Sequence, residues 1–177
     1  KKWLEKVDWI YVIVPLALLG TFWVIASFAG QWPWQSNPYN SYALQTDSWL
    51  KGRLDLGQDY PWLELAIYQG KYFVSFPPFP SYVLIPFVMI FGTNTPDHLI
   101  ALLVTIAGCV YAIKLYREVS LEKQHALFWV LMLYFASGYL FVGMNGYVWF
   151  IAQSMSFTLS LMALYYALRQ KGGLSLA

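Results

Sequence analysis

Four long runs of apolar residues dominate the chain, and more polar stretches separate them. The runs cover about residues 9–29, 99–116, 126–142 and 150–168. Each is close to the roughly 18–20 residues that a helix needs to cross a hydrocarbon core of about 30 Å. Segments in lipid must satisfy their own backbone hydrogen bonds, so runs of this length are expected to be helical. The pattern predicts one all-α membrane domain over residues 1–177, with about four transmembrane helices.

A fifth apolar segment, residues 78–91, is shorter than the other four. It contains Pro80 and Pro86, and Gly92 follows it. A segment of about 14 residues fits an interfacial or re-entrant position better than a complete crossing. We therefore expect it to lie at the outer membrane surface.

The polar segment over residues 30–97 is expected to be a long outer loop with short surface helices. Residues 41–50 have helical spacing, and residues 68–73 are typical of a turn followed by an extended piece. Five of the nine acidic residues lie in this loop: Asp47, Asp55, Asp59, Glu64 and Asp97. We therefore expect the catalytic or ligand-binding residues to lie in this loop.

The placement of lysine and arginine predicts the orientation of the helices. Eight of the eleven basic residues lie before the first run, between the second and third, or after the fourth. Basic residues near membrane spans favour the cytoplasmic side. The N-terminus is therefore predicted to be cytoplasmic and the 30–97 loop outside. If residues 78–91 were a span, the predicted orientation of every later helix would be reversed, and the basic residues 114–123 would lie outside.

Composition supports an integral membrane protein and excludes some functions. The chain is 59% hydrophobic and 11% charged, against about 25% charged residues in an ordinary soluble domain. Its net charge of +2 is too small to indicate a nucleic-acid partner. The single cysteine, Cys109, excludes an internal disulfide.

Two charged residues of the loop have alternative interpretations. Asp47, on the expected 41–50 helix, can bind a divalent cation or take a proton from a hydroxyl. It can equally form an ion pair with Lys51, one helical turn later. Lys71, with Tyr72 beside it, can bind a phosphate or sugar-bearing headgroup, or can simply anchor at the lipid headgroups.

Two motifs of the loop resemble those of GT-C membrane glycosyltransferases, such as protein O-mannosyltransferases and lipid A aminoarabinose transferases. The stretch GKYFVSFPPFP, residues 70–80, with Phe91-Gly92 after the short apolar run, is similar to a G-x-x-Y-F-x-K-P-P-L stretch that ends in F-G. Residues 42–56 resemble a second family stretch that ends in L-D-L. The acidic pair that usually precedes this stretch in the family is replaced here by Asn37-Pro38-Tyr39-Asn40-Ser41.

The resemblance implies transfer of a sugar from a polyprenyl-phosphate donor at the outer membrane face. In that class an acidic residue of the first outer loop acts as the base or as a metal ligand. Carried over to this chain, the implied catalytic residues are Asp47 and Glu64, and Asp47 is also the implied ligand of a divalent cation. The implied substrate-binding residues are Lys71, Tyr72, Tyr42 and Arg53.

A non-enzymatic interpretation remains beside this one. In this interpretation the chain is a small integral subunit. Its apolar helices contact membrane lipids and pack against larger membrane partners. Small residues at Ala136, Ser137 and Gly138 suit close helix–helix contact. Pigment or haem binding is disfavoured because the only histidines, His98 and His125, lie at predicted helix ends.

Overall fold

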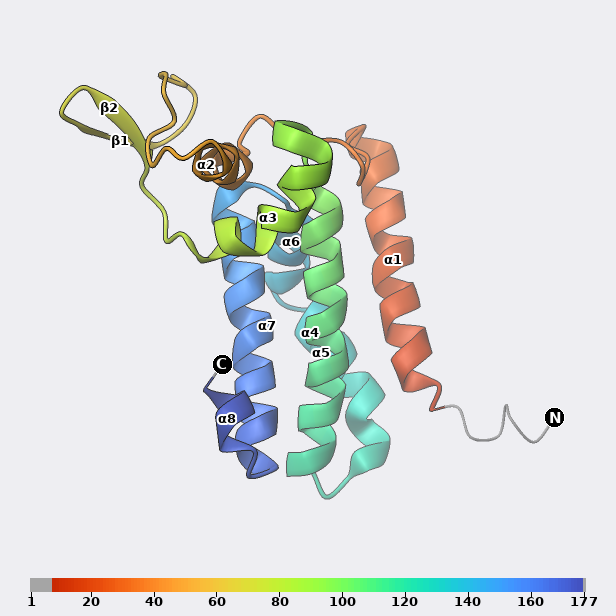
Figure 1. The fold of residues 1–177 in the computed structure, drawn as a ribbon. Helices are drawn as coiled ribbons and strands as arrows, with labels where there is room; N and C mark the ends of the chain where they lie inside the picture. The colour runs from red at the N-terminus through yellow and green to blue at the C-terminus, as the bar shows by residue number, and fades with distance from the viewer. Residues whose placement is uncertain (1–7, 177) are drawn as a thin grey trace.

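The computed structural model describes residues 8–176, and three long helices form its main body (Figure 1). They are α1 (Ile10–Ala29), α4 (Asp97–Val119) and α7 (Val148–Leu168). Each is long and apolar enough to cross a membrane. The predicted helical character is confirmed, and three of the four predicted spans exist as continuous helices.

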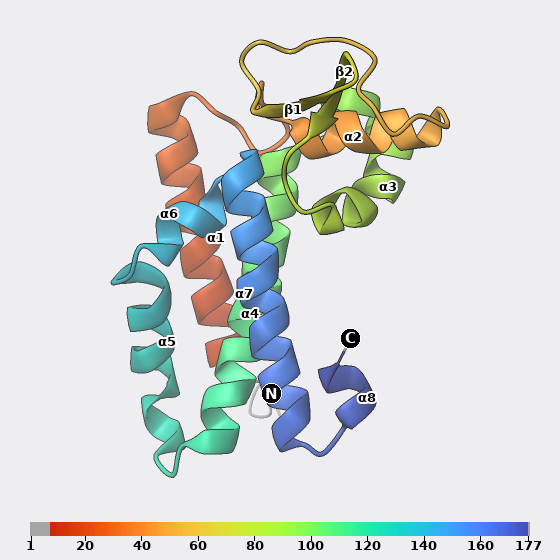
Figure 2. The same cartoon turned by 90° about the vertical axis from the view of Figure 1, so that its left-hand side faces the viewer.

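The segment expected to form one helix over residues 126–142 is instead divided in two. Helix α5 covers Ala126–Phe135, and α6 covers Tyr139–Met144. Ser137 lies in the break, where its hydroxyl donates to the Leu133 carbonyl and accepts from the Tyr139 N–H. A serine that bonds to local backbone groups competes with the helical ladder, so the expectation of one continuous helix was wrong. In the views of Figures 1 and 2, α5 and α6 together return the chain toward the start of α7.

Helices α4 and α7 form the centre of the bundle, and a glycine allows their close approach. A Cβ added at Gly108 of α4 would lie 2.6 Å from Thr158 Oγ1 of α7, and Thr158 donates to the Val104 carbonyl. Helices α1 and α5 pack against α4 and against each other. The largest buried cluster includes Val14, Leu18, Ile113, Val130 and Tyr134.

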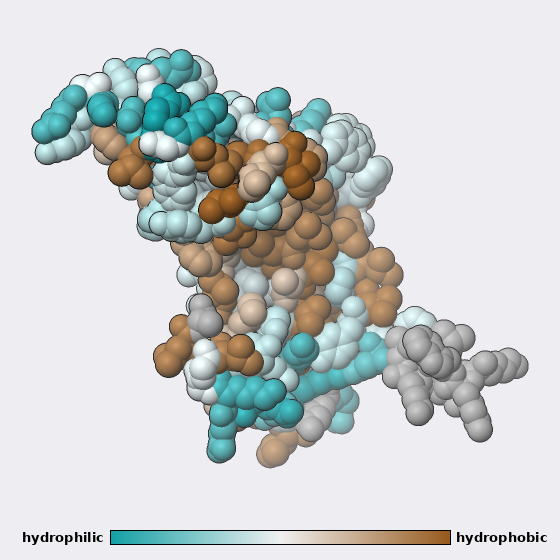
Figure 3. Space-filling model, viewed as in Figure 1, coloured by the Kyte–Doolittle hydropathy of each residue, from teal (hydrophilic) through white to brown (hydrophobic). Residues whose placement is uncertain are grey.

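The outward faces of the long helices are strongly apolar. Figure 3 shows a hydrophobic band across the middle of one face of the molecule, between two more hydrophilic ends. Exposed large side chains on these helices include Leu16, Trp23, Phe28, Leu103 and Leu164. A contiguous apolar surface of this kind is unusual for a soluble monomer and is typical of a membrane or partner contact.

The residues before α4 fold into a cap, defined here as residues 30–96, at the end of the bundle where α4 and α7 begin (Figure 2). The cap contains α2 (Ser41–Leu50), the strands β1 (Leu65–Tyr68) and β2 (Lys71–Val74), and α3 (Phe79–Phe91). The strands form an antiparallel hairpin in which Tyr68 pairs with Lys71. The predicted helix at 41–50 and the turn within 68–73 are confirmed.

Helix α3 is the short apolar segment with two prolines, and it packs against α2 and α7. Its contact with α2 includes a hydrogen bond of 2.8 Å from Thr46 Oγ1 to the Ser81 carbonyl. Gly92 follows α3 with a φ of +60°, a conformation that favours glycine. Three shorter elements complete the described part of the chain: the 3-10 turns Gly92–Asn94 and Lys123–His125, and α8 (Gly172–Ser175), which lies beside α7.

Candidate functional site

A cleft in the cap brings together several of the charged residues singled out in the sequence. Its volume is about 420 Å³. Polar groups predominate in its lining, which consists of Leu44, Asp47, Ser48, Lys51, Arg53, Leu56, Gly57, Gln58, Tyr60 and Thr93. Helix α2 supplies one wall, and the irregular segment after it supplies most of the other. Of the residues that the resemblance implies, the cleft contains Asp47 and Arg53.

Asp47 forms the ion pair with Lys51 that its spacing allowed. Lys51 Nζ lies 2.6 Å from Asp47 Oδ2, and the Lys51 side chain is 60% exposed. An exposed helix pair of this kind contributes only about 0.3–0.5 kcal/mol. The pair therefore neutralises Asp47 in this structure, but an incoming phosphate can compete for Lys51 at little cost.

Arg53 offers a guanidinium without an acidic partner among the described residues. It lies over Gly57, where an added Cβ would be 2.1 Å from the Arg53 Nη1 atom. Gly57 has a φ of +77°, and its N–H donates to Asp55 Oδ2 at 3.2 Å. The local turn therefore favours glycine for its backbone conformation, whereas the flexible end of Arg53 could move aside.

The other implied residues lie outside the cleft lining. Glu64 Oε2 accepts a hydrogen bond of 3.3 Å from Trp149 Nε1 at the start of α7. Lys71 Nζ lies 3.7 Å from Asp55 Oδ1. Tyr72 is half-buried in β2, and its carbonyl accepts from the Leu56 N–H at 2.9 Å. Glu64 is thus linked to the bundle, whereas Lys71 is linked to the segment that borders the cleft.

Tyr42 is buried rather than presented to a ligand. Only 3% of it is exposed, and its ring packs edge-on against Phe76. Its hydroxyl has no hydrogen-bond partner among the described residues. Burial raises the pKa of Tyr42 to about 12, so this phenol stays neutral at physiological pH. In this structure Tyr42 contributes to the packing of α2.

Sequence reasoning missed a buried polar cluster where the cap meets the bundle. Asn37 Nδ2 donates to Asp97 Oδ2 at 2.9 Å and to the Gly146 carbonyl at 3.2 Å. The Gly146 N–H in turn donates to His98 Nδ1 at 3.2 Å. In the sequence Asp97 is one of the loop acids and the acid that opens the second long helix, and neither feature indicates burial. The one local signal was Asn37 before a proline, which is typical of a turn in which the side chain accepts from the Tyr39 N–H.

The described residues contain no preformed cluster of metal ligands. Within residues 8–176, no group of three His, Cys, Asp or Glu side chains is close enough to hold a metal ion. The carboxylate of Asp47, the implied ligand, is occupied by Lys51.

No protein-family model, curated protein or solved structure matches this chain. The function is therefore inferred from the cleft and its charged side chains alone.

Proposed function

We propose that this chain is part of a membrane glycosyltransferase that takes a sugar from a polyprenyl-phosphate donor at the outer membrane face. The observation that carries the proposal is the cap cleft, which gathers Asp47, Lys51 and Arg53 beside the bundle. A carboxylate next to two cations suits a reaction in which one group accepts a proton and the others bind a phosphate. Arginine, with its planar fork of donors, is well suited to phosphate.

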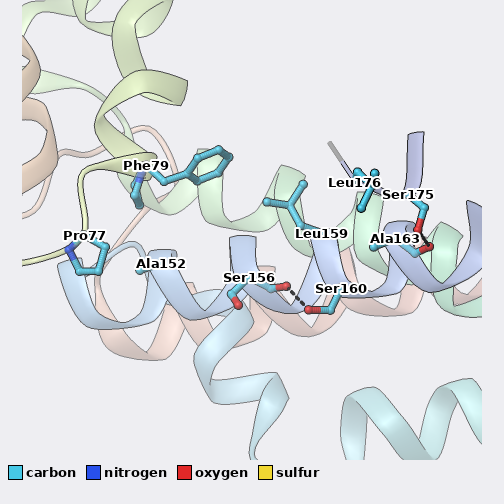
Figure 4. A pocket seen from close by; sticks show the side chains of 10 residues that line it. Pro77, Phe79, Ala152, Ser156, Leu159, Ser160, Ala163, Ser175 and Leu176 are labelled. Carbon is cyan, nitrogen blue, oxygen red and sulfur yellow. Dashed lines mark hydrogen bonds between the residues drawn. The ribbon is translucent and has the colours of Figure 1, made fainter. Parts of the chain in front are cut away.

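A second feature supports a donor with a long apolar chain. A groove of about 520 Å³ runs beside α7 between the start of α3 and α8 (Figure 4). Its only hydroxyls belong to serines, of which Ser160 and Ser175 donate to the backbone carbonyls of Ser156 and Ala163. Two of its three serine hydroxyls are therefore engaged, and the rest of the lining is apolar, which suits an isoprenoid chain.

The proposed reaction uses the chain's own side chains. Lys51 and Arg53 bind the donor phosphate, which draws Lys51 away from Asp47. The freed Asp47 carboxylate accepts the proton of the acceptor hydroxyl. The hydroxyl oxygen forms the new bond to the anomeric carbon while the bond from that carbon to the phosphate oxygen breaks. Polyprenyl phosphate leaves with the bonding electrons. Glu64, which lies outside the cleft lining, is the second candidate base.

The orientation in this proposal follows from the distribution of charge. Lys114, Arg117, Arg169 and Lys171 all lie at or near the end of the bundle opposite the cap. Positive residues favour the cytoplasmic side, so the cap faces outward and α3 lies at the outer membrane surface. In this proposal α5 and α6 together make the fourth crossing.

The test is sugar transfer from a polyprenyl-phosphate donor by the full-length protein in proteoliposomes. Asp47→Asn should reduce transfer by roughly 100-fold or more, because a positioned base typically contributes at least that much. Asp59→Asn is the matched control, since Asp59 lies in the same loop but does not line the cleft. Equal activity of both variants would remove Asp47 from the mechanism.

The alternative function is a non-catalytic integral subunit of a larger membrane complex. The Asp47–Lys51 ion pair favours it, because the first candidate base is neutralised in this structure. An intact wild-type protein that transfers no sugar from any polyprenyl-phosphate donor would contradict the enzymatic proposal and support the subunit.

A further inference from the structure

The end of the bundle opposite the cap carries a lysine surrounded by tyrosines. Lys114 of α4 lies with its Nζ atom 4.7 Å from the centroid of the Tyr111 ring and 5.7 Å from that of Tyr165. Tyr111 and Tyr166 share a hydrogen bond of 2.9 Å between their hydroxyls. We call these four residues the lysine–tyrosine site. They come from α4 and α7, the two helices at the centre of the bundle.

The charge of Lys114 is not balanced within the described residues. The neighbouring acids are engaged elsewhere, since Asp8 pairs with Arg117 and Glu118 pairs with Arg169 at 2.9 Å. Glu118 is one helical turn from Lys114 and would otherwise be its natural partner. Cation–π contacts hold an ammonium in place without cancelling its charge. The site therefore has one cation in excess.

The hydroxyl pair adds a hydrogen-bond donor. Two tyrosine hydroxyls carry two protons, and the bond between Tyr111 and Tyr166 uses one of them. The second proton remains available to an acceptor outside the pair. An ammonium beside a free phenolic donor is complementary to a phosphate oxygen.

The position of the site indicates that the phosphate belongs to a lipid. Lys114 lies five residues before the end of α4 at Val119, or roughly 7–8 Å along the helix axis at 1.5 Å per residue. A lysine this close to the end of a membrane helix is within reach of the headgroup region. The same ends of both helices carry exposed apolar residues, among them Val119, Leu164 and Leu168, and these can contact an acyl chain.

We propose that Lys114, Tyr111 and Tyr166 bind the phosphate of an anionic membrane lipid at the end of the bundle opposite the cap. The two arginines nearby are held by acids and take no part. This site is independent of the cap cleft and of the proposed sugar transfer.

The experiment measures the thermal unfolding midpoint of the full protein in a neutral detergent as lipid is added. Phosphatidylglycerol should raise the midpoint, whereas phosphatidylcholine should raise it much less. Lys114→Gln should weaken the apparent affinity for phosphatidylglycerol on the order of tenfold, the value of a direct hydrogen bond to a charged group. Lys171→Gln is the matched control because it removes the same charge from the same end, and it should bind like the wild type.

Other variants keep the test decisive. Tyr166→Phe removes a hydroxyl without changing charge and should weaken binding even if Lys114→Gln fails to fold. Lys114→Arg should retain binding. Equal losses in Lys114→Gln and Lys171→Gln would overturn the proposal in favour of a general charge effect. An equal rise produced by inorganic phosphate alone would overturn the assignment to a lipid.

Discussion

At the scale of single residues, the most constrained position is Gly146 in the buried polar cluster. Its backbone touches the first turn of α4 while its N–H and carbonyl bond to His98 and Asn37. Asn37 in turn bonds to the Asp97 carboxylate. These bonds connect the segment after α1, the start of α4 and the turn before α7. Breaking them would be unfavourable, because a buried carboxylate without hydrogen bonds is costly.

We predict that Gly146→Ala destabilises the protein strongly. The added Cβ would lie 2.4 Å from the Asp97 carbonyl carbon and 2.5 Å from the His98 nitrogen. Both are backbone atoms and cannot rotate away, so a loss of about 1–3 kcal/mol or more is expected from overpacking. Thermal unfolding followed by circular dichroism in detergent measures the change.

Gly20→Ala is the matched control for this variant. Gly20 lies within α1, and an added Cβ there meets nothing within 4 Å. Alanine favours the helix over glycine by up to about 1 kcal/mol. Gly20→Ala should therefore leave the midpoint unchanged or raise it. A Gly146→Ala protein as stable as Gly20→Ala would show that the contact at Gly146 is not close.

At the scale of elements, the outcome of sequence reasoning depends on how local each signal is. Helix α2 and the hairpin turn could be predicted because periodicity and glycine act over a few residues. The break between α5 and α6 could not, because Ser137 and Gly138 interrupt a continuous apolar run without a proline. The Asn37–Asp97 bond joins residues 60 positions apart, and nothing in a single sequence indicates such a pairing. For the same reason, the sequence could name Asp47 and Glu64 but could not show that only Asp47 lines the cleft.

Substitutions at two adjacent residues of the hairpin turn are predicted to change the stability of the hairpin in opposite directions. Gln69 and Gly70 have φ values of +48° and +71°, a conformation that asparagine and glycine tolerate best. Gln69→Asn should stabilise the hairpin and Gly70→Ala should destabilise it, each by up to about 1 kcal/mol. Amide hydrogen exchange in β1 and β2 should be slower in the first variant and faster in the second. Changes of the same sign in both variants would contradict the turn geometry.

At the scale of the whole molecule, three features agree on one arrangement. An apolar band crosses the middle of the face shown in Figure 3, and the cap lies at one end of it. The basic residues Lys114, Arg117 and Arg169 lie on the last turns of α4 and at the end of α7, toward the other end. Three helices are long enough to span. Because α4 is the longest of them and connects the cap to the basic end, its two termini test the arrangement most directly.

We predict that cysteines at the two ends of α4 react from opposite sides of the membrane. Asn94→Cys lies in the cap, in the turn Gly92–Asn94, and Leu121→Cys lies just beyond α4 at a fully exposed position. In intact cells, a membrane-impermeant maleimide should label Asn94→Cys, whereas Leu121→Cys should be labelled only after permeabilisation. The native Cys109 is buried, so the unmodified protein provides the background. Labelling of both cysteines from one side would show that α4 does not cross. Labelling with the sides exchanged would keep the crossing but place the cap cleft in the cytoplasm, away from the outer face that the proposed sugar transfer requires.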